Sequence, residues 1–237
     1  MLLEILFEDE YLIAINKPSG LLVHRTSIAA DETVFALQLL RDQIGQHVHP
    51  VHRLDRPTSG ILLFAKQEAI LPQLKSLFSE REVEKTYLAL VRGIPTVKQA
   101  MIDYPLKSER SGRMQEAQTS YQVIGESEIP FDTTGRYPTS RYSLLELKPE
   151  TGRTHQIRRH LAHIRHYIIG DKKHGDNKQN IFFEKQFGLT NLLLHAHRLV
   201  FKHPITDSRI SINCAFPPHF TKTLRDIQLD SSQIAVE

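Results

Sequence analysis

The sequence lacks the features that mark secreted and membrane-bound proteins. It contains one cysteine, Cys214, so no disulfide can form within the chain, and this composition is typical of a reducing cytoplasm. No uninterrupted apolar run is longer than five residues, which excludes a membrane-spanning helix. The first ten residues, MLLEILFEDE, carry acids where a secretory signal needs cations. We therefore expect a cytoplasmic protein without a signal sequence.

A strong charge surplus is also missing. The 30 lysines and arginines exceed the 27 aspartates and glutamates by only three, which by itself does not indicate a nucleic-acid partner. The distribution of charge is more informative, because residues 152–169 contain four arginines, four histidines and no acid. Such a segment is suited to face RNA, although a solvated basic helix has the same composition.

The apolar periodicity predicts many strands and a few irregularly placed helices. We expect strands near 4–7, 11–16, 47–53, 60–66, 85–92, 117–124, 140–148, 193–201 and 208–214. We expect helices from a cap at Asp31 to Gly45, over 67–80 with Ala69, Leu74, Leu77 and Phe78 inward, over 154–165, and after Pro217-Pro218. Surface loops are expected at 106–116 and 125–139, and a frayed tail at 231–237. Together these elements predict an α+β fold, with a mostly antiparallel mixed sheet flanked by helices, in one domain over 1–237.

The motif with the most chemical information is HRLDRPTSG at 52–60. Asp55 lies between two arginines, so we expect an ionised carboxylate, suited to be a nucleophile and poorly suited to be a general acid. In a purely structural interpretation, the Asp-Arg pair pins a turn formed by Pro57 and Gly60. The complete string resembles the signature of the RluA-type pseudouridine synthases, whose aspartate is the catalytic nucleophile.

Two further motifs extend this resemblance, EKTYLALVRG at 84–93 and TGRTHQIRRH at 151–160. The resemblance implies that Tyr87 lies against the target base and that Arg153 pairs with the catalytic aspartate. Arg53 is then placed to fill the space that a flipped base leaves, or to hold its phosphate. A strand tyrosine such as Tyr87 can equally be a packing residue.

Three other arginines, Arg158, Arg159 and Arg165, are candidates for contacts with the RNA backbone, because guanidinium groups match phosphate oxygens in two-point geometry. The alternative for each of them is an exposed surface arginine. The strings IIGDKKHGD and LHAHRLVFKHP also resemble family segments, and we interpret both as mainly structural. In the first string His174 stands where the family usually has tyrosine.

The strings DQIGQHV, TGRYPT and RRHLAHIRH are similar to those of bacterial family members that modify uridine 65 of tRNA. The resemblance therefore implies isomerisation of a tRNA uridine to pseudouridine without a cofactor or a metal. It implies tRNA as the partner, no membrane, no obligate protein partner and no S4-like domain before the catalytic one. A synthase acting on ribosomal RNA or another tRNA position stays an alternative, as does a non-catalytic RNA-binding module.

The histidines allow one more alternative, a metal-dependent RNA hydrolase. His155, His160, His163 and His166 are clustered, and imidazoles are good zinc ligands. However, their spacing differs from H-E-x-x-H, and no acid lies near them. We therefore predict no metal site.

Overall fold

The computed structural model describes residues 1–24, 34–133 and 135–229, and the Asp31 cap and the 231–237 tail predicted above lie outside them. The contacts divide the chain into two compact units, each described here by itself. The first unit comprises residues 1–85 and 196–215, and the second comprises 86–195 and 216–237. Of the residues described, no stretch forms a helix with the length and apolar character needed to cross a membrane.

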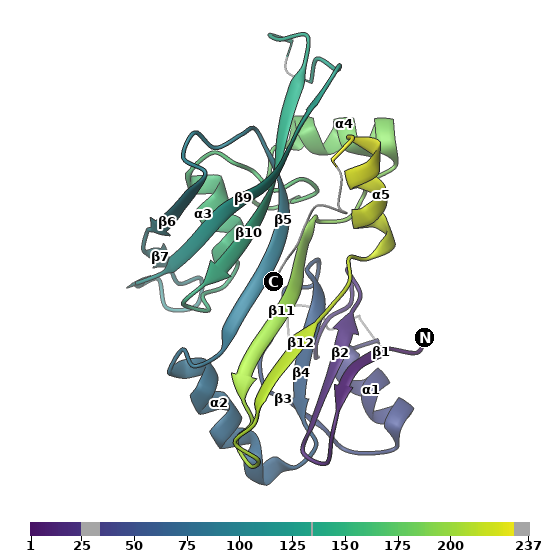
Figure 1. Ribbon diagram of the computed structural model, residues 1–237, viewed down its shortest axis with the longest axis vertical. Helices are drawn as coiled ribbons and strands as arrows, with labels where there is room; N and C mark the ends of the chain where they lie inside the picture. The colour runs from purple at the N-terminus through teal and green to yellow at the C-terminus, as the bar shows by residue number, and fades with distance from the viewer. Residues whose placement is uncertain (25–33, 134, 230–237) are drawn as a thin grey trace. The chain divides into compact units, whose positions relative to one another are not determined.

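The first unit is a sheet with helices packed on it (Figure 1). In chain order its elements are β1 (Glu4–Glu8), β2 (Leu12–Lys17), α1 (Ala36–Ile44), β3 (His49–Pro50), β4 (Ser59–Ala65), the 3-10 turn η2 (Glu68–Ile70), α2 (Leu71–Ser79), most of β11 (Leu194–Lys202) and β12 (Arg209–Asn213). The pairs β1–β2, β2–β4, β3–β4 and β11–β12 are all antiparallel.

The central strands of this unit are buried on both faces. All seven residues of β4 are buried, and in β2 Leu12 to Ile15 are fully buried. Alternate residues of these strands, with Ile70 and Leu74, form one apolar cluster. This explains why β2 and β4 are continuous apolar runs in the sequence rather than alternating ones.

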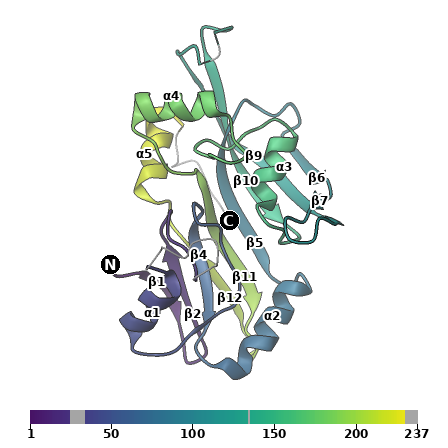
Figure 2. The ribbon, with the colours of Figure 1, turned by 180° about the vertical axis from the view of Figure 1, so that it is seen from behind.

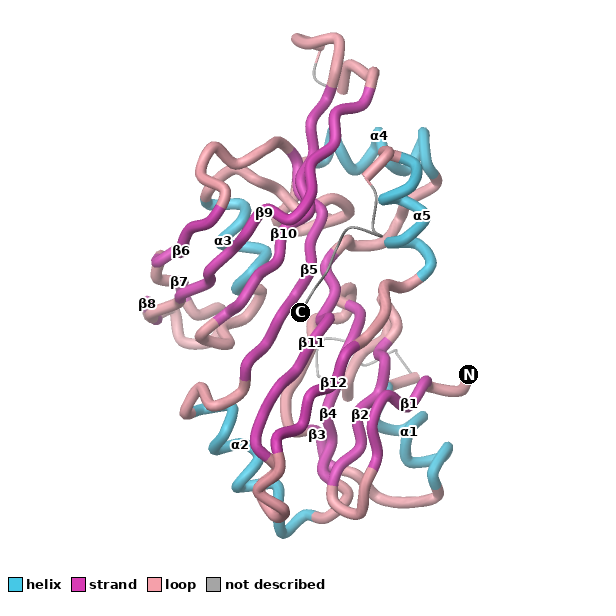
Figure 3. Tube along the Cα trace, in the orientation of Figure 1, coloured by secondary structure: helices cyan, strands magenta, loops and turns pink. Residues whose placement is uncertain are grey.

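The second unit is built on the antiparallel order β5-β10-β9-β6 (Figure 3, strands in magenta). Its elements are β5 (Glu84–Arg92), β6 (Gln99–Asp103), the short pair β7 (Leu106–Lys107) and β8 (Met114–Gln115), β9 (Gln118–Ile129), β10 (Ser140–Pro149), α3 (Gln156–His163), α4 (Asn177–Phe187) and α5 (Pro218–Asp226).

Helices cover both faces of this second sheet (Figure 2). One face carries Val91 and Leu145 and packs against Ile157 and Leu161 of α3. The opposite face carries Leu90 and Leu144 and packs against α4 and α5, through residues that include Phe183, Phe220 and Leu224. Because successive strand residues alternate between faces, one run of apolar residues serves both layers.

The predicted α+β class and antiparallel sheet are confirmed, and most predicted strands and helices are present within a few residues. The helix ending at Gly45 is confirmed, with this glycine in the left-handed conformation at its C-cap. The single domain over 1–237 stays a prediction.

Several element predictions were wrong. The segment 106–116 contains β7 and β8, and β9 runs on to Ile129, so among the described residues of the predicted 125–139 loop only 130–133 and 135–139 lie outside strands. Residues 51–53 lie outside β3, while β6 and α4 were not predicted. Ala69 is exposed and Ile70 is buried instead, because a 3-10 turn occupies this position.

Gly60 was expected at the start of the strand over 60–66, and it lies in β4, where it pairs with Lys17 of β2. Its φ angle of +108° is one that L side chains rarely adopt. A Cβ added there would meet the Ala196 carbonyl oxygen at 2.2 Å. A glycine is therefore required for β11 to approach β4.

We expect Gly60→Ala to lower the free energy of unfolding by more than about 3 kcal/mol, because backbone strain and a backbone clash add. Gly45→Ala is the matched control, since its φ is +63° but no atom lies within 4 Å of the added Cβ. It should cost only about 1–2 kcal/mol. Denaturant unfolding measures both, and equal losses would contradict the role of the close approach.

Candidate active site

Asp55 lies in the loop that joins β3 to β4. The Thr58 backbone N–H donates to the Asp55 carbonyl at 3.0 Å, which closes a four-residue turn containing Pro57. The Asp55 side chain is half-buried, while Thr58 and Ser59 after it are buried. The carboxylate is thus carried by an anchored turn that leads directly into a buried strand.

The turn that follows β2 holds this loop in place. The Gly20 N–H donates to the Arg56 carbonyl at 2.9 Å, and the Arg56 Nε donates back to the Gly20 carbonyl at 3.0 Å. The Ser19 hydroxyl donates to the Pro57 carbonyl at 2.7 Å. The turn after β2 and the Asp55 loop, which are distant in sequence, are therefore bonded to each other at Arg56 and Pro57, directly after Asp55.

Lys17 is the principal feature of this loop that the sequence analysis missed. Its side chain is fully buried, and Nζ donates to the carbonyls of Pro18 (3.0 Å), Leu21 (2.9 Å) and Arg56 (3.1 Å), which uses all three donors of an ammonium group. Burial lowers the pKa of Lys17 to about 7, and the nearby Asp55 carboxylate acts in the opposite direction. A lysine at the end of a buried apolar strand was the available sequence signal.

His52 anchors the start of the same loop. Its ring stacks on Phe78 with centroids 4.8 Å apart, and its Nε2 accepts a hydrogen bond from the Leu63 N–H at 3.1 Å. Burial, and next the positive charge of Lys85, lower the pKa of His52 to about 4. The ring is therefore neutral with its proton on Nδ1, and it acts as an anchor rather than as a proton donor.

The two arginines beside Asp55 are exposed. Arg56 contributes to the loop through the hydrogen bond described above. The exposure of Arg53 is compatible with contact to RNA, but its predicted role at the flipped base stays a prediction.

In the second unit, a buried glutamine shapes the TGRTHQIRRH segment. The Gln156 Oε1 accepts from the Thr151 hydroxyl (2.6 Å) and the Arg153 N–H (3.0 Å). Its Nε2 donates to the Gln118 carbonyl (2.9 Å) and the Thr119 hydroxyl (3.1 Å). These four hydrogen bonds use the whole amide and fix the backbone of Arg153 against β9.

Arg153 and Tyr87, which the resemblance places beside the catalytic aspartate and the target base, are both half-buried. The Arg153 Nε donates to the Glu116 carbonyl at 3.0 Å. Tyr87 lies on the same face of β5 as Ala89 and Val91, packed against the cluster beneath α3. Because the two units are described separately, the pairing of Arg153 with Asp55 and the contact of Tyr87 with a base stay predictions.

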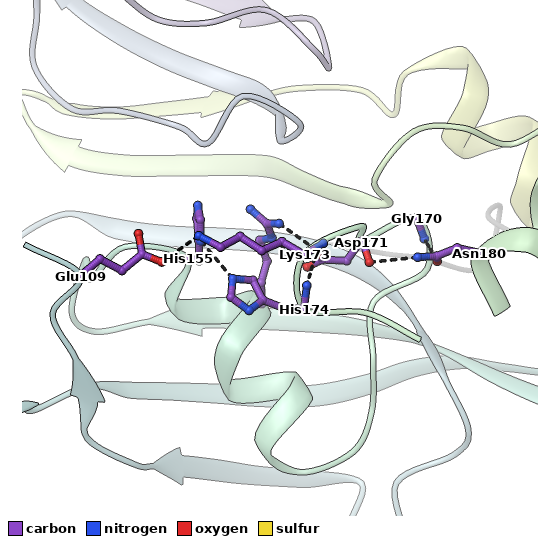
Figure 4. A network of polar contacts seen from close by, with 8 residues as sticks. Glu109, His155, Gly170, Asp171, Lys173, His174 and Asn180 are labelled. Atoms are coloured by element: carbon purple, nitrogen blue, oxygen red, sulfur yellow. Dashed lines mark hydrogen bonds and ion pairs between the residues drawn. The ribbon is translucent and has the colours of Figure 1, made fainter. Parts of the chain in front are cut away.

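Arg158 forms a buried ion pair with Asp171, the carboxylate labelled in Figure 4. Its Nε and Nη2 donate to the two carboxylate oxygens at 2.7 and 2.8 Å, and only 5 % of Arg158 is exposed. Burial raises the pKa of Asp171, but Arg158 and the N–H groups of Lys173 and His174 outweigh it and lower the pKa overall. This corrects the prediction that Arg158 contacts phosphates, since its guanidinium is used inside the protein.

Figure 4 also shows His174 facing His155, with 3.0 Å between His174 Nε2 and His155 Nδ1. Because these two nitrogens share one hydrogen bond, one of them must lack a proton. Burial is the main cause that lowers the pKa of His174, which favours the neutral ring. The Lys173 ammonium donates to the Glu109 carboxylate at 2.8 Å. The segment around His174 is thus tied to the TGRTHQIRRH segment, which agrees with its structural interpretation.

The remaining backbone candidates, Arg159 and Arg165, lie closer to the surface. Arg159 is half-buried and its Nη1 donates to the Lys107 carbonyl at 3.0 Å. Arg165 is exposed in the turn after α3, with a φ angle of +62°. Both stay candidates for RNA contacts.

The clustered histidines have separate structural roles. His160 is fully buried, its Nε2 lies 3.0 Å from the Tyr104 carbonyl and its Nδ1 lies 2.9 Å from the Thr119 hydroxyl. Since a carbonyl only accepts, the proton is on Nε2 and the hydroxyl donates to Nδ1. His163 stacks on the Tyr104 ring with centroids 3.6 Å apart. Within the described part of the chain, no three His, Cys, Asp or Glu side chains are grouped as a metal site.

Comparison with known sequences points to a family of RNA-modifying enzymes. A family model described as RNA pseudouridylate synthase matches residues 11–163. A tRNA pseudouridine synthase C of Vibrio parahaemolyticus is 46 % identical over 96 % of this chain and 97 % of its own length. The protein of that name from Pasteurella multocida is 49 % identical, over 91 % of each chain.

A solved structure leads to the same family. Human RNA pseudouridylate synthase domain containing 4 superposes with a TM-score of 0.74 at 28 % identity. The match covers 96 % of this chain and 94 % of the human one, so the similarity extends over nearly the whole fold.

We expect Lys17→Met to lower the free energy of unfolding by at least about 2 kcal/mol, because it leaves buried carbonyls without their donor. Lys75→Met, at an exposed position of α2, is the control and should leave stability within about 0.5 kcal/mol of the wild type. Chemical denaturation measures both variants. Equal stabilities would show that Lys17 does not hold the loop.

Proposed function

Because this chain belongs to the RNA pseudouridylate synthase family, we propose that it isomerises a specific uridine of tRNA, with Asp55 as the nucleophile. The reaction breaks the N-glycosidic bond and rejoins the same uracil to ribose through a carbon atom. No atom is gained or lost, so the protein has to supply an anion, hold the freed base near the sugar and exclude water. The names of the curated relatives support tRNA as the substrate.

The observation that carries this proposal is the anchored Asp55 loop. The carboxylate is half-buried, close enough to the Lys17 ammonium to influence its pKa, and carried by a turn whose carbonyls are hydrogen-bonded. A nucleophile fixed before substrate arrives loses little freedom on reaction, which is how positioned groups accelerate chemistry.

Three further roles follow from the family resemblance and form part of the proposal. Tyr87 supports the extruded uracil, Arg153 orients the Asp55 carboxylate, and Arg53 occupies the position that the base leaves or holds its phosphate. Extrusion costs a few kcal/mol of unstacking, so a residue that replaces the base in the stack lowers that cost.

The target position that we propose is uridine 65, on the resemblance of the strings quoted above. Unmodified tRNA transcripts incubated with the purified protein, and mapped nucleotide by nucleotide for pseudouridine, test it directly. Modification at position 65 supports the proposal. Modification only at another tRNA position or in ribosomal RNA fragments contradicts the proposed target.

Asp55→Asn should reduce turnover by on the order of 10⁴ or more while leaving the Kd for tRNA within about twofold, since it removes a reacting group without changing size. Single-turnover pseudouridine formation and filter binding measure the two quantities. Asp42→Asn, an exposed carboxylate on α1, is the control and should turn over normally. Substantial turnover by Asp55→Asn would remove this residue from the role of nucleophile.

Arg159→Gln and Arg165→Gln should each weaken tRNA binding and reduce the slope of log Kobs against log salt by about 0.7–0.9, the change for one lost phosphate contact. Binding titrations between low and moderate salt measure the slope. An unchanged slope for either variant would assign that arginine to the protein surface alone.

Arg158→Met provides the contrast within the same helix. Its removal leaves the Asp171 carboxylate buried without its cation, and we expect a loss of about 3–5 kcal/mol of stability. Denaturant unfolding of the Arg158 and Arg159 variants thus separates the buried arginine from the RNA-facing one.

A further inference from the structure

A cavity of about 300 Å³ lies at the outer part of the β9–β10 hairpin in the second unit, and the proposed reaction does not use it. Its size is at the low end of the range for small-ligand pockets. It is lined by Arg92, Gly93, Glu128, Thr133, Tyr137, Pro138, Thr139, Ser140, Arg141, Tyr142 and Gln179. Figure 1 shows this hairpin projecting at the top of the view, with α4 beside it.

One side of the cavity is a fixed chain of hydrogen bonds. The buried Tyr142 hydroxyl donates to Gln179 Oε1, Gln179 Nε2 donates to the Thr133 hydroxyl, and Thr133 is bonded to the Ser140 hydroxyl, each at 2.7 Å. Ser140 in turn donates to the Phe131 carbonyl at 2.7 Å. These groups satisfy one another, so this wall is preformed and does not have to reorganise for a ligand.

Three further lining residues, Glu128, Tyr137 and Arg141, are exposed and carry complementary chemistry. Tyr137 has 67 % of its surface exposed, which is high for an aromatic side chain. Arg141 is also exposed, and its register partner across the β9–β10 pair is Glu128. Because directly opposed residues project from the same face of a sheet, a cation and a carboxylate lie side by side near the exposed ring.

We propose that this cavity binds one unpaired nucleotide of the tRNA other than the target uridine. This inference rests on the function proposed above. The base stacks on the Tyr137 ring, its N–H groups donate to Glu128, and the phosphate contacts Arg141.

This set of groups selects a nucleotide over simpler ligands. An aromatic ring beside a guanidinium is the combination that proteins use for unstacked bases and their backbone. A bare anion would be repelled by Glu128, and an apolar ligand would leave the polar lining without partners. A nucleotide alone among these carries a ring, N–H donors and a negative charge together.

A fluorescence titration tests the contact itself. The chain contains no tryptophan, so Tyr137→Trp introduces a single reporter at the cavity. We expect saturable quenching by an unmodified tRNA transcript at the concentrations where filter binding shows the complex. Bound tRNA without quenching overturns the proposal, and so does quenching by adenosine monophosphate alone at those same concentrations, which would indicate a site for free nucleotides.

Steady-state kinetics test the contribution to recognition. Tyr137→Ala should raise KM for tRNA roughly 5- to 150-fold with kcat unchanged, which corresponds to the about 1–3 kcal/mol that one base–aromatic stack contributes. Tyr137→Phe, which keeps the ring, should restore KM to within about twofold of the wild-type value. Ile181→Ala, at an exposed position of α4 outside the cavity lining, is the control and should leave both constants unchanged. An unchanged KM for Tyr137→Ala overturns the proposal and assigns this surface to another class of partner.

The two proposals fail differently. If the wild-type protein forms no pseudouridine in tRNA, the proposed function fails, while the fluorescence titration still reports whether RNA occupies the cavity. If pseudouridine forms normally in Tyr137→Ala with an unchanged KM, the cavity proposal fails and the proposed function stands.

Discussion

A single buried ammonium group sets the geometry on which the proposed chemistry depends. Lys17 has no exposed surface, and an uncompensated cation in such a position is strongly destabilising. The backbone satisfies it by turning the carbonyls of Pro18, Leu21 and Arg56 toward Nζ. Because Asp55 directly precedes Arg56, the backbone position that Lys17 needs also restricts where the Asp55 carboxylate can lie. The Asp55 carboxylate also acts on Lys17 in return, because its negative charge raises the lysine pKa and opposes part of the lowering that burial causes.

The second unit uses buried polar groups in the same way. Gln156 uses all its hydrogen-bonding groups on the backbone around Arg153 and on β9, and Arg158 forms an ion pair with Asp171. Neither interaction is strong evidence for stability by itself, because desolvation offsets much of the gain. Their effect is on position: alternative placements of these loops would leave a buried amide or charge unpaired. The proposed reaction depends on such placement, since a positioned group loses little freedom when it reacts.

The sequence predicted correctly those elements whose structure is determined by neighbouring residues. The apolar runs of β2, β4 and β5 and the glycine at the end of α1 were sufficient, because burial and left-handed backbone select few residue types. The polar helix α4 was missed because its apolar residues do not form a clear stripe, although Asp176 caps it with two hydrogen bonds. The residues that hold the loops of the candidate site in place were harder to predict from the sequence. The role of Lys17 depends on a carbonyl 39 residues away and that of Arg158 on a carboxylate 13 residues away, and neither partner is visible in the spacing of a motif.

Burial, more than membership of a motif, separates the arginines of this chain by function. Arg158 and Arg159 are adjacent in sequence and equally basic, yet the first is enclosed with a carboxylate and the second lies closer to solvent. A buried guanidinium that is already paired with an internal carboxylate has no free face for a phosphate. An exposed guanidinium can bind a phosphate and release counterions from the RNA, which favours binding. The same distinction applies along the β9–β10 hairpin, where the internally bonded Tyr142 and Gln179 form a wall and the exposed Tyr137 and Arg141 remain at the surface. In the proposed function, contact with RNA therefore falls to side chains that the fold leaves at the surface, while the buried polar groups hold the loops of their own unit in place.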